Sequence, residues 1–181
     1  MKTTFVILTL LVLAVIFIYN SLVRRRNRVK EAWADIDVQL KRRHNLIPNL
    51  VNAVKGYMGH ERGVLENVTK ARAEALKAGS PKEREQKENM LTDTLKTLFA
   101  VSENYPDLKA SANFLDLQRE LADAENKIMA ARRFYNTNVR DYNTAIQSFP
   151  TNMLAGMFNF KEETLFEVKV EEEREVPKVE F

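Results

Sequence analysis

Few residues of this chain combine a type and a spacing that could catalyse a reaction. The chain has no Cys and only 2 His among 181 residues. His60 and Glu61 begin the zinc-protease pattern H-E-x-x-H, but Val64 stands where the second His is needed. Neither His follows a Glu at the spacing of a di-iron bundle, and the sequence lacks phosphate-loop and nucleophile-elbow patterns. We therefore predict a protein that is not an enzyme, with no catalytic residue, no metal ligand and no cofactor.

One polar group of interest remains between positions 132 and 143. Its candidate members are Arg132, Arg133, Tyr135, Asn138 and Tyr142. If this stretch is antiparallel to the helix that follows the N-terminal segment, it lies beside Trp33, Asp35 and Asp37. Our preferred interpretation is a polar layer that fixes the helix register, in which Tyr hydroxyls and Arg side chains meet the aspartates. The alternative is a groove for a partner or a ligand.

These side chains belong to the clearest periodic pattern of the chain. Every seventh residue from 114 to 149 is large and apolar or aromatic, and the positions three residues later are mostly small. Tyr135, Asn138 and Tyr142 fall on this a/d seam, which is typical of a coiled coil. The pattern predicts one helix over 111–148, ended by Pro150 and roughly 57 Å long.

A second long helix is expected to continue from the N-terminal segment. Apolar residues recur on one face from Trp33 to Val54, and Pro48 inside this pattern predicts a kink. Three glycines between 56 and 63 indicate a helix end and a turn. The alternative is a helix that is only loosened there, which would leave three helices in place of four.

Two shorter helices are expected between the long ones, over about 61–78 and from residue 81 to about 104. Ser80 and Glu83 form a capping box at the start of the second. Alternating helix directions then give an all-α fold, in which an up-down four-helix bundle with long first and last helices occupies 24–149.

The N-terminal segment has the length and composition of a membrane span. Residues 3–23 form a run of 21 without a charge. As a helix this run spans roughly 31 Å, the thickness of a bilayer core. We assign 1–23 to a retained transmembrane anchor. A cleaved signal peptide is the alternative, but no A-x-A-like site follows the run.

A basic cluster directly after the span predicts its orientation. The cluster comprises Arg24, Arg25, Arg26, Arg28 and Lys30. Positive flanks stay in the cytoplasm, so we expect the N-terminus outside and the bundle on the cytoplasmic side of a single-pass anchor. An extracytoplasmic bundle is the alternative. The same side chains could contact anionic lipid headgroups.

The two C-terminal segments differ in composition. Residues 150–160 are apolar and should lie near the membrane, either docked on the bundle, which we prefer, or inserted into the interface. Residues 161–181 hold eight Glu against four Lys and Arg, and predict a flexible acidic tail. The overall net charge of +3 is too small for a nucleic-acid binder. A seam as regular as this one could also recruit a second copy, so a homo-oligomer stays open.

Several separate blocks of the sequence, in order, resemble the LemA family. They are Tyr19-Asn20, Ala32-Trp33, RHNLIPNLV at 43–51, VKGY at 54–57 with His60-Glu61, ENYPDLKA at 103–110, RRFYN at 132–136, RDYN at 140–143 and Phe149-Pro150. The resemblance covers about residues 19–160 and implies a membrane-anchored bacterial protein with a four-helix bundle. It supplies neither a reaction nor catalytic residues. Some relatives carry a lipobox Cys before the Tyr-Asn pair, which this chain lacks.

An anchor, a basic cluster, a long bundle and little chemistry predict a non-enzymatic membrane-anchored scaffold or interaction protein. It would belong to the bacterial cell envelope and serve membrane organisation or remodelling. The alternative is a regulatory adaptor for a membrane protease or a signalling system. The sequence does not identify the protein partner.

Overall fold

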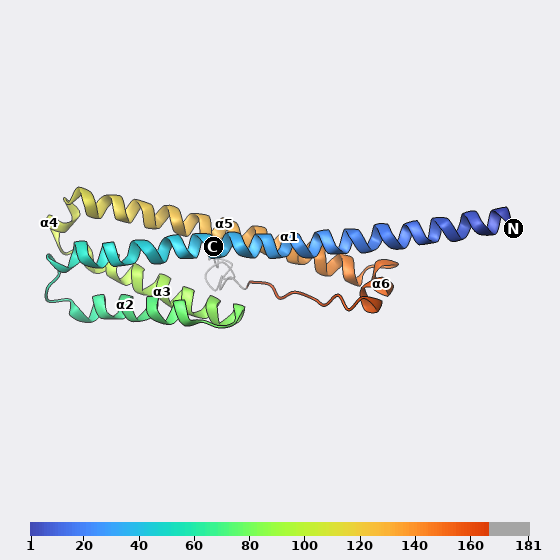
Figure 1. Cartoon of the computed structure of the whole chain (residues 1–181). Coiled ribbons are helices and arrows are strands. Elements are labelled where there is room, and N and C mark those ends of the chain that lie inside the picture. Colours follow the sequence, from blue (N-terminus) through green and yellow to red (C-terminus); the bar gives the residue numbers. More distant parts are fainter. Residues whose placement is uncertain (167–181) are drawn as a thin grey trace, which may run out of the picture.

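A computed structural model describes residues 1–166 of the chain (Figure 1). In this part the regular elements are α1 (Lys2–Lys55), α2 (Arg62–Lys77), α3 (Pro81–Ser102), α4 (Pro106–Lys109), α5 (Ala112–Gln147) and α6 (Thr151–Met157). The prediction of an all-α fold is confirmed, since the described residues contain no strand.

The first helix, α1, is one uninterrupted element of 54 residues. It continues through Pro48 and ends at Lys55. The chain turns over the next six residues, and the buried Met58 holds this turn by donating its backbone N–H to Val54 O at 2.9 Å. The predicted helix end is therefore confirmed, and the continuous alternative is wrong.

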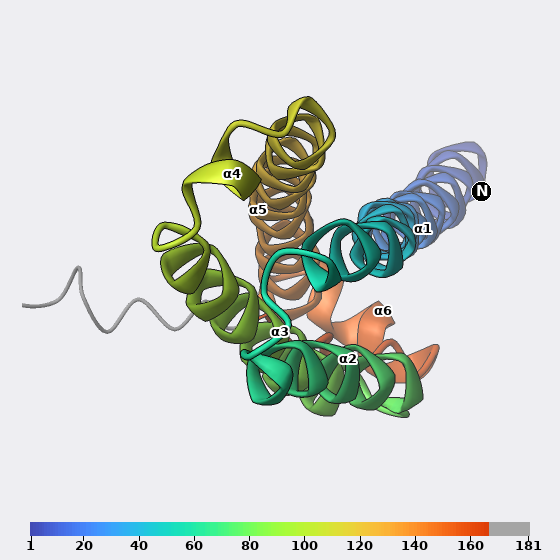
Figure 2. The same cartoon turned by 90° about the vertical axis from the view of Figure 1, so that its left-hand side faces the viewer.

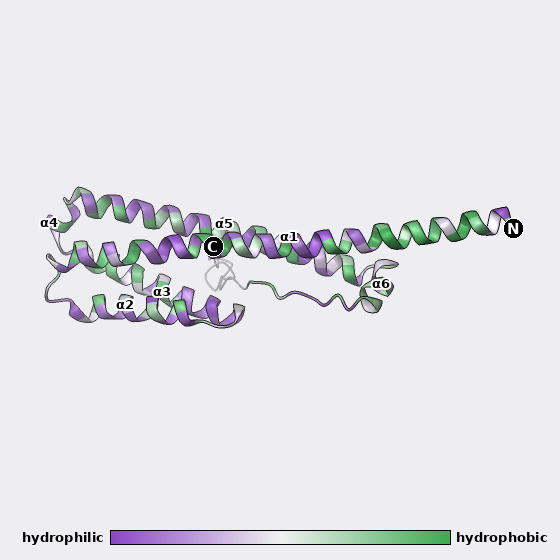
Figure 3. Cartoon of the chain, viewed as in Figure 1, coloured by the Kyte–Doolittle hydropathy of each residue, from purple (hydrophilic) through white to green (hydrophobic). Residues whose placement is uncertain are grey.

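The N-terminal part of α1 extends away from the rest of the molecule and has no protein cover (Figures 1 and 3). Phe5, Leu8 and Phe17 are 72%, 61% and 69% exposed. A core helix of a soluble protein buries such side chains, whereas almost none of this apolar stretch is buried. Within residues 1–166, α1 is the one helix long enough and apolar enough to cross a membrane.

Four of these helices form two antiparallel pairs, α1 with α5 and α2 with α3 (Figures 1 and 2). At the end far from the N-terminus all four contribute to one apolar cluster, here called the bundle core, with Leu50, Val68, Leu98 and Phe114 among its members. A second cluster, the stalk core, lies along α1 and the C-terminal half of α5 and includes Ile36, Ile128 and Tyr142.

The junction between α2 and α3 has the predicted capping residues in a slightly different arrangement. Ser80 Oγ accepts a hydrogen bond from the Glu83 N–H at 3.2 Å. The Glu83 carboxylate accepts from the Gly79 N–H at 3.1 Å, rather than from Ser80. Both capping residues therefore satisfy backbone donors at this helix start, which explains why its position could be predicted to the residue.

The seam of α5 changes register halfway along the helix. Ten buried residues mark it: Phe114, Leu117, Leu121, Ala124, Ile128, Arg132, Tyr135, Val139, Tyr142 and Ile146. Along a regular seam the spacing between buried residues alternates between three and four, but the spacings from Ala124 to Ile128 and from Ile128 to Arg132 are both four. This irregularity, called a stutter, moves the second seam position of each later heptad by one residue. The predicted seam position of Asn138 is therefore wrong, and that of Phe149 is wrong because α5 ends at Gln147, before this residue. Asn138 donates to Phe134 O within its own helix at 2.8 Å, and Phe149 is 80% exposed.

Beyond α5 the chain folds back along the part of the α1–α5 pair that contains the stalk core, here called the stalk. Helix α6 contacts α1 and α5, and its Ala155 is buried in the stalk core. Residues 161–166, here called the strap, then run in an extended form toward the bundle (Figure 1). Phe166 is only 3% exposed, so the packed part of the chain extends past the boundary predicted at residue 160. The rest of the predicted tail, 167–181, lies outside the described residues.

Candidate functional site

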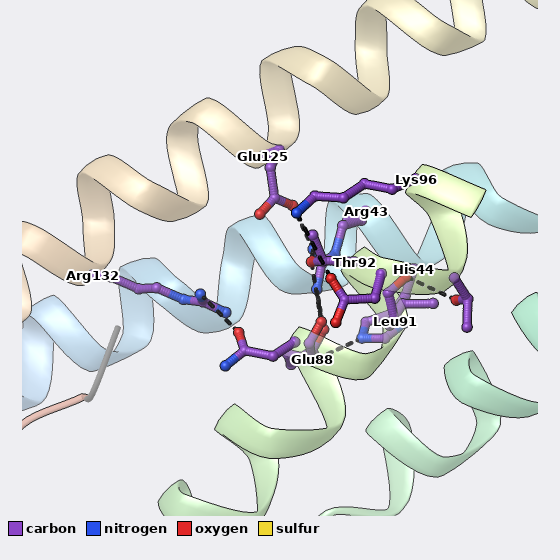
Figure 4. A network of polar contacts seen from close by, with 11 residues as sticks. Arg43, His44, Glu88, Leu91, Thr92, Lys96, Glu125 and Arg132 are labelled. Carbon is purple, nitrogen blue, oxygen red and sulfur yellow. Dashed lines mark hydrogen bonds and ion pairs between the residues drawn. The ribbon is translucent and has the colours of Figure 1, made fainter. Parts of the chain in front are cut away.

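The most deeply buried charges lie where the bundle core meets the stalk core (Figure 4). Arg43 of α1 is 1% exposed, and its guanidinium pairs with the carboxylates of Glu88 on α3 and Glu125 on α5. It also donates to Thr92 Oγ1 at 2.8 Å and to the backbone oxygen of Glu88 at 3.3 Å. The Arg43 side chain therefore links α1 to both α3 and α5. Arg43, His44, Glu88, Thr92 and Glu125 are called the junction network below.

His44 completes the network from the same turn of α1. Its Nε2 lies 2.8 Å from Glu88 Oε1. Burial works to raise the pKa of Glu88, but the hydrogen bond from His44 and the charge of Arg43 outweigh it and lower the pKa. Glu88 is thus an ionised acceptor at neutral pH, and His44 Nε2 is the donor. Glu88 thus ties α3 to two side chains of α1, with one donor on each carboxylate oxygen.

Arg132 connects this region to the strap. Its guanidinium stacks over the Phe166 ring at 4.5 Å and donates to Asn89 Oδ1 at 3.4 Å. Burial and the nearby charge of Arg43 lower the pKa of Arg132. Its Nε and Nη2 are buried and have no hydrogen-bond partner within residues 1–166. Besides the Asn89 hydrogen bond, the ring of Phe166 and the nearby carboxylates of Glu88 and Glu125 stabilise this buried cation.

Two Tyr-Asn pairs on α5, seven residues apart, hold the strap. Asn143 donates to Glu163 O at 2.8 Å and accepts from the Glu163 N–H at 3.0 Å. Asn136 makes the same two bonds to the backbone of Phe166, each at 2.7 Å. Each amide thus binds one strap residue at both its N–H and its C=O, as a neighbouring strand would.

The tyrosines of the two pairs add a second row of bonds. Tyr135 donates its hydroxyl to Thr164 O at 2.9 Å, and Tyr142 donates to Lys161 O at 3.0 Å. Seven helical residues advance about 10.5 Å, and three extended residues advance about 10 Å. One Tyr-Asn pair therefore matches every three residues of the strap. These contacts are made to the backbone, while Phe166 supplies the buried side chain.

The structure brings together some of the predicted site residues and separates others. Trp33 packs edge-on against Tyr135, with ring centroids 5.3 Å apart, as the antiparallel register predicts. Asp37 pairs with Arg84 of α3 instead of an arginine of α5, and Asp35 is exposed. The expected meeting of Tyr and Arg with these aspartates is therefore wrong. The hydroxyls of Tyr135 and Tyr142 bond to backbone oxygens of the strap instead.

The remaining predicted residues lie at the surface or close to the N-terminal apolar part of α1. Arg133 is exposed, and so are Arg24, Arg25, Arg28 and Lys30. The fifth member of the basic cluster behaves differently, because Arg26 stacks over the Phe160 ring at 5.0 Å.

A pocket of about 550 Å³ opens between α1, α3 and the strap. Trp33, Tyr135 and Phe166 form its apolar side, and Lys82, Gln86, Asn89 and Asp93 contribute polar groups from α3. Of the candidate residues predicted for a groove, Tyr135 lines this pocket, whereas Asp35, Asp37, Arg132, Arg133, Asn138 and Tyr142 do not. No group of His, Asp and Glu within residues 1–166 is arranged to hold a metal ion.

Sequence reasoning missed the junction network and the strap contacts, although each left a signal. Arg43 and His44 lie between Leu40 and Ile47 on the apolar face of α1, so at least one of them had to point into the core. Glu88 lies three and seven residues before Leu91 and Leu95, a spacing that puts it on the same face of α3 as these leucines. For the strap, the signal was the repeat of Tyr-Asn at 135–136 and 142–143.

Comparison with known proteins places these features in a family context. The model of the LemA family matches residues 32–181. The chain is 28% identical over 152 residues to "Protein LemA" of Metamycoplasma hominis, an alignment that covers 82% of this chain and 68% of that protein. It is 25% identical over 177 residues to "Magnetosome protein MamQ" of Magnetospirillum gryphiswaldense and to "Magnetosome protein MamQ 2" of Paramagnetospirillum magneticum. These alignments cover 83% of this chain, and the chain spans 65% of each magnetosome relative.

Proposed function

The chain belongs to the LemA family, and from this premise we propose that it is a non-enzymatic, membrane-anchored scaffold or interaction protein of the bacterial cell envelope. The observation that carries the proposal is α1 itself. Its uncovered apolar part passes without a break into the stalk and the bundle. One helix can thus anchor the chain and hold the bundle at a fixed place relative to the bilayer.

The dimensions of α1 support the role of a spacer. From Arg24 to Lys55 the helix is about 48 Å long, and α5 runs beside it for most of this distance. The junction network resists sliding of these helices, because a shift would separate Arg43 from Glu88 and Glu125 and leave charges buried without partners. A spacer of defined length suits a protein that presents a surface to partners.

We also propose that α1, α2, α3 and α5 form a four-helix bundle that faces the cytoplasm. The bundle core supports the first part, since it contains residues of all four helices. The exposed basic residues directly after the apolar stretch support the orientation.

Orientation can be tested with a cysteine in this Cys-free chain. Leu76→Cys places one thiol on α2 at a position that is 56% exposed. In intact cells a membrane-impermeant maleimide should label it only after lysis. Labelling before lysis would place the bundle outside the cytoplasm, and partners would then be sought there.

The interaction role can be tested with photo-crosslinking side chains in the full chain in cells. One would replace Met90, which lines the pocket, and the other Leu76, which is exposed on the neighbouring helix. A scaffold predicts membrane-associated protein crosslinks from both positions. Substrate turnover by the purified chain that a point mutation abolishes would contradict the proposal, as would the absence of protein crosslinks at both positions.

The pocket beside Trp33 favours a second candidate, a regulatory adaptor for a membrane protease or signalling system. Its apolar aromatic wall and polar rim are the usual features of a site for one specific partner. In the same experiment an adaptor predicts one dominant crosslink from Met90 and none from Leu76.

A further inference from the structure

We propose that α6 and its flanking residues insert into the membrane interface beside α1, so that the chain contacts the bilayer at two places. This inference rests on the anchor in the proposed function. The contacting surface, here called the interfacial patch, consists of Phe149, Met153, Met157 and Phe158, which are 80%, 64%, 77% and 48% exposed. Helix α6 uses Ala155 to pack on α1 and leaves these large apolar side chains uncovered.

The sequence around the patch lacks charges over a long stretch. No charged residue occurs between Asp141 and Lys161. A surface helix in water normally carries charges on its outer face, whereas α6 carries none on any face. Large apolar side chains together on an outer surface are typical of contact with a membrane or a protein.

The register of the helix pair places this uncharged stretch at the level of the membrane boundary. Trp33 contacts Tyr135, Arg43 pairs with Glu125, and the charge of Arg26 acts on Tyr142. In this antiparallel register Arg24, the first charge after the span, lies level with the beginning of the uncharged stretch near Asn143. Charged residues therefore end at the same level on both helices. A single water–lipid boundary explains this coincidence.

The depth of the patch agrees with an interfacial position. Tyr19 of α1 contacts the rings of Phe158 and Phe160, with centroids 4.8 and 5.9 Å apart. Tyr19 precedes Val23, the last uncharged residue of the span, by four positions, so it lies about 6 Å inside the boundary. Interfacial helices bury their apolar faces about 5–10 Å deep, and Tyr is common at this level. The basic cluster would then contact the headgroups just above the patch.

A lipid bilayer is the occupant that these observations favour. The patch adjoins the part of α1 that is itself bare and apolar, so a bilayer that surrounds residues 3–23 already reaches it (Figure 3). A second copy of the chain would have to displace that lipid. The second contact would also fix the rotation of the stalk about the membrane normal, which a single span leaves free.

The test uses a polarity-sensitive fluorophore on single cysteines of the full chain, reconstituted in vesicles of phosphatidylcholine and phosphatidylglycerol. Met157→Cys reports on the patch. Leu76→Cys is the matched control, a large apolar residue that is 56% exposed on α2, outside the pocket and away from the N-terminal end of α1. At position 157 we expect blue-shifted emission and about twofold quenching by lipids brominated near the headgroup. Position 76 should show water-like emission without quenching.

Two further measurements separate the possible failures. Leu8→Cys reports on the anchor and should be quenched by lipids brominated deep in the acyl chains. Quenching at 8 but not at 157 would overturn this inference and leave the anchor standing, whereas quenching at neither would overturn both. A blue shift at 157 that depends on the protein-to-lipid ratio and resists lipid quenchers would assign the patch to a second copy, and would also overturn the inference.

Discussion

The bundle core and the stalk core are built along the same two long helices, yet they are closed in different ways. In the bundle core four helices cover one another, and the members are mostly aliphatic, such as Leu50, Leu91 and Leu98. In the stalk core the helix pair α2–α3 is replaced by α6 and the strap. This cluster contains four buried aromatic residues, Tyr135, Tyr142, Phe160 and Phe166, whereas the bundle core contains one, Phe114.

The difference follows from how backbone hydrogen bonds are satisfied. A helix brings its own hydrogen bonds to a core, so leucines alone can cover it. An extended strap brings unpaired N–H and C=O groups, and these need partners when the strap is packed against other elements. The Tyr-Asn pairs of α5 provide those partners. The bundle should therefore unfold as a unit, whereas the strap can leave the stalk while the helices stay in place.

The largest effect is expected at the boundary between the two regions. Arg43→Met removes the cation that Glu88 and Glu125 share and leaves Glu88 buried with His44 alone. We expect a loss of about 3–5 kcal/mol in the free energy of unfolding, because an uncompensated buried charge remains. Denaturant titration of the full chain in micelles, followed by circular dichroism, measures it.

The control for this substitution is Lys96→Met, which removes an exposed ion pair with Asp93 on the same bundle. Its unfolding midpoint should stay close to that of the unchanged chain. If Arg43→Met had an equally small effect, the junction network would not be the link between the two cores.

The second effect should be confined to the stalk. Phe166→Ala removes the buried anchor of the strap, which lies 6.0 Å from the Trp33 ring, at a cost of about 3 kcal/mol to strap docking. Trp33 is the single Trp of the chain, so its emission reports on this place. We expect a red shift of that emission and faster proteolysis at Lys161, with an unchanged helix unfolding midpoint.

Phe149→Ala is the matched substitution, because Phe149 is also C-terminal and aromatic but 80% exposed. In micelles it should leave the Trp33 emission unchanged. A lowered helix midpoint in Phe166→Ala would mean that the strap and the bundle unfold together, which contradicts the comparison above.

A smaller effect should come from a single amide. Asn136→Ala removes both hydrogen bonds to the Phe166 backbone, and we expect strap docking to weaken by about 1–3 kcal/mol. Hydrogen exchange of the Phe166 amide measures this change. Asn138→Ala is the control on the same turn, since its amide bonds only within its own helix. Equal exchange rates in the two variants would show that the strap is held by Phe166 alone.

The helices could be predicted from the sequence because their signals are local. The uncharged run at 3–23, the Ser80 cap and the helix end predicted at about residue 104, just before Pro106, each depend on a few neighbouring residues. The stutter at Ile128 was not predicted, because its cause is not local. A strict heptad would have placed Ala131 on the seam, whereas Arg132 points inward there to reach Asn89 and Phe166.

The site was harder to predict because its members are far apart in sequence. Arg43 and Glu88 come from different helices, and only the folded arrangement shows which acid meets which base. For the strap, composition was misleading. Eight Glu over 161–181 predict a solvated tail, yet the buried Phe166 and the hydrogen bonds of the Tyr-Asn pairs together dock its first six residues. The family match, which extends to residue 181, also includes this segment.

The finest distinction between the two regions is their response to pH. In the bundle the pKa of Glu88 is lowered from its ordinary value of 4.5. A group of this kind stabilises the fold above its unfolded pKa, and the contribution is lost as the pH falls through the folded pKa. Acid should therefore reduce helix stability below about pH 4.5, and Glu88→Gln should show a shallower dependence by circular dichroism.

The stalk should respond at the opposite end of the pH scale. Burial, and to a smaller extent the charge of Glu163, raises the pKa of Tyr135 above 10.0. Such a group favours the packed state below its unfolded pKa, and this contribution is lost as the pH rises through the folded pKa. Strap release, seen as a red shift of Trp33, should therefore begin above about pH 10 while the helices persist. Tyr135→Phe should weaken this alkaline step, because it keeps the ring against Trp33 and removes one ionisable hydroxyl. Combining it with Tyr142→Phe should abolish the step, since the pKa of Tyr142 is also raised by burial and its hydroxyl also binds the strap. A red shift that accompanies the acid loss of helix instead would mean that one cooperative unit, rather than two, spans the long helices.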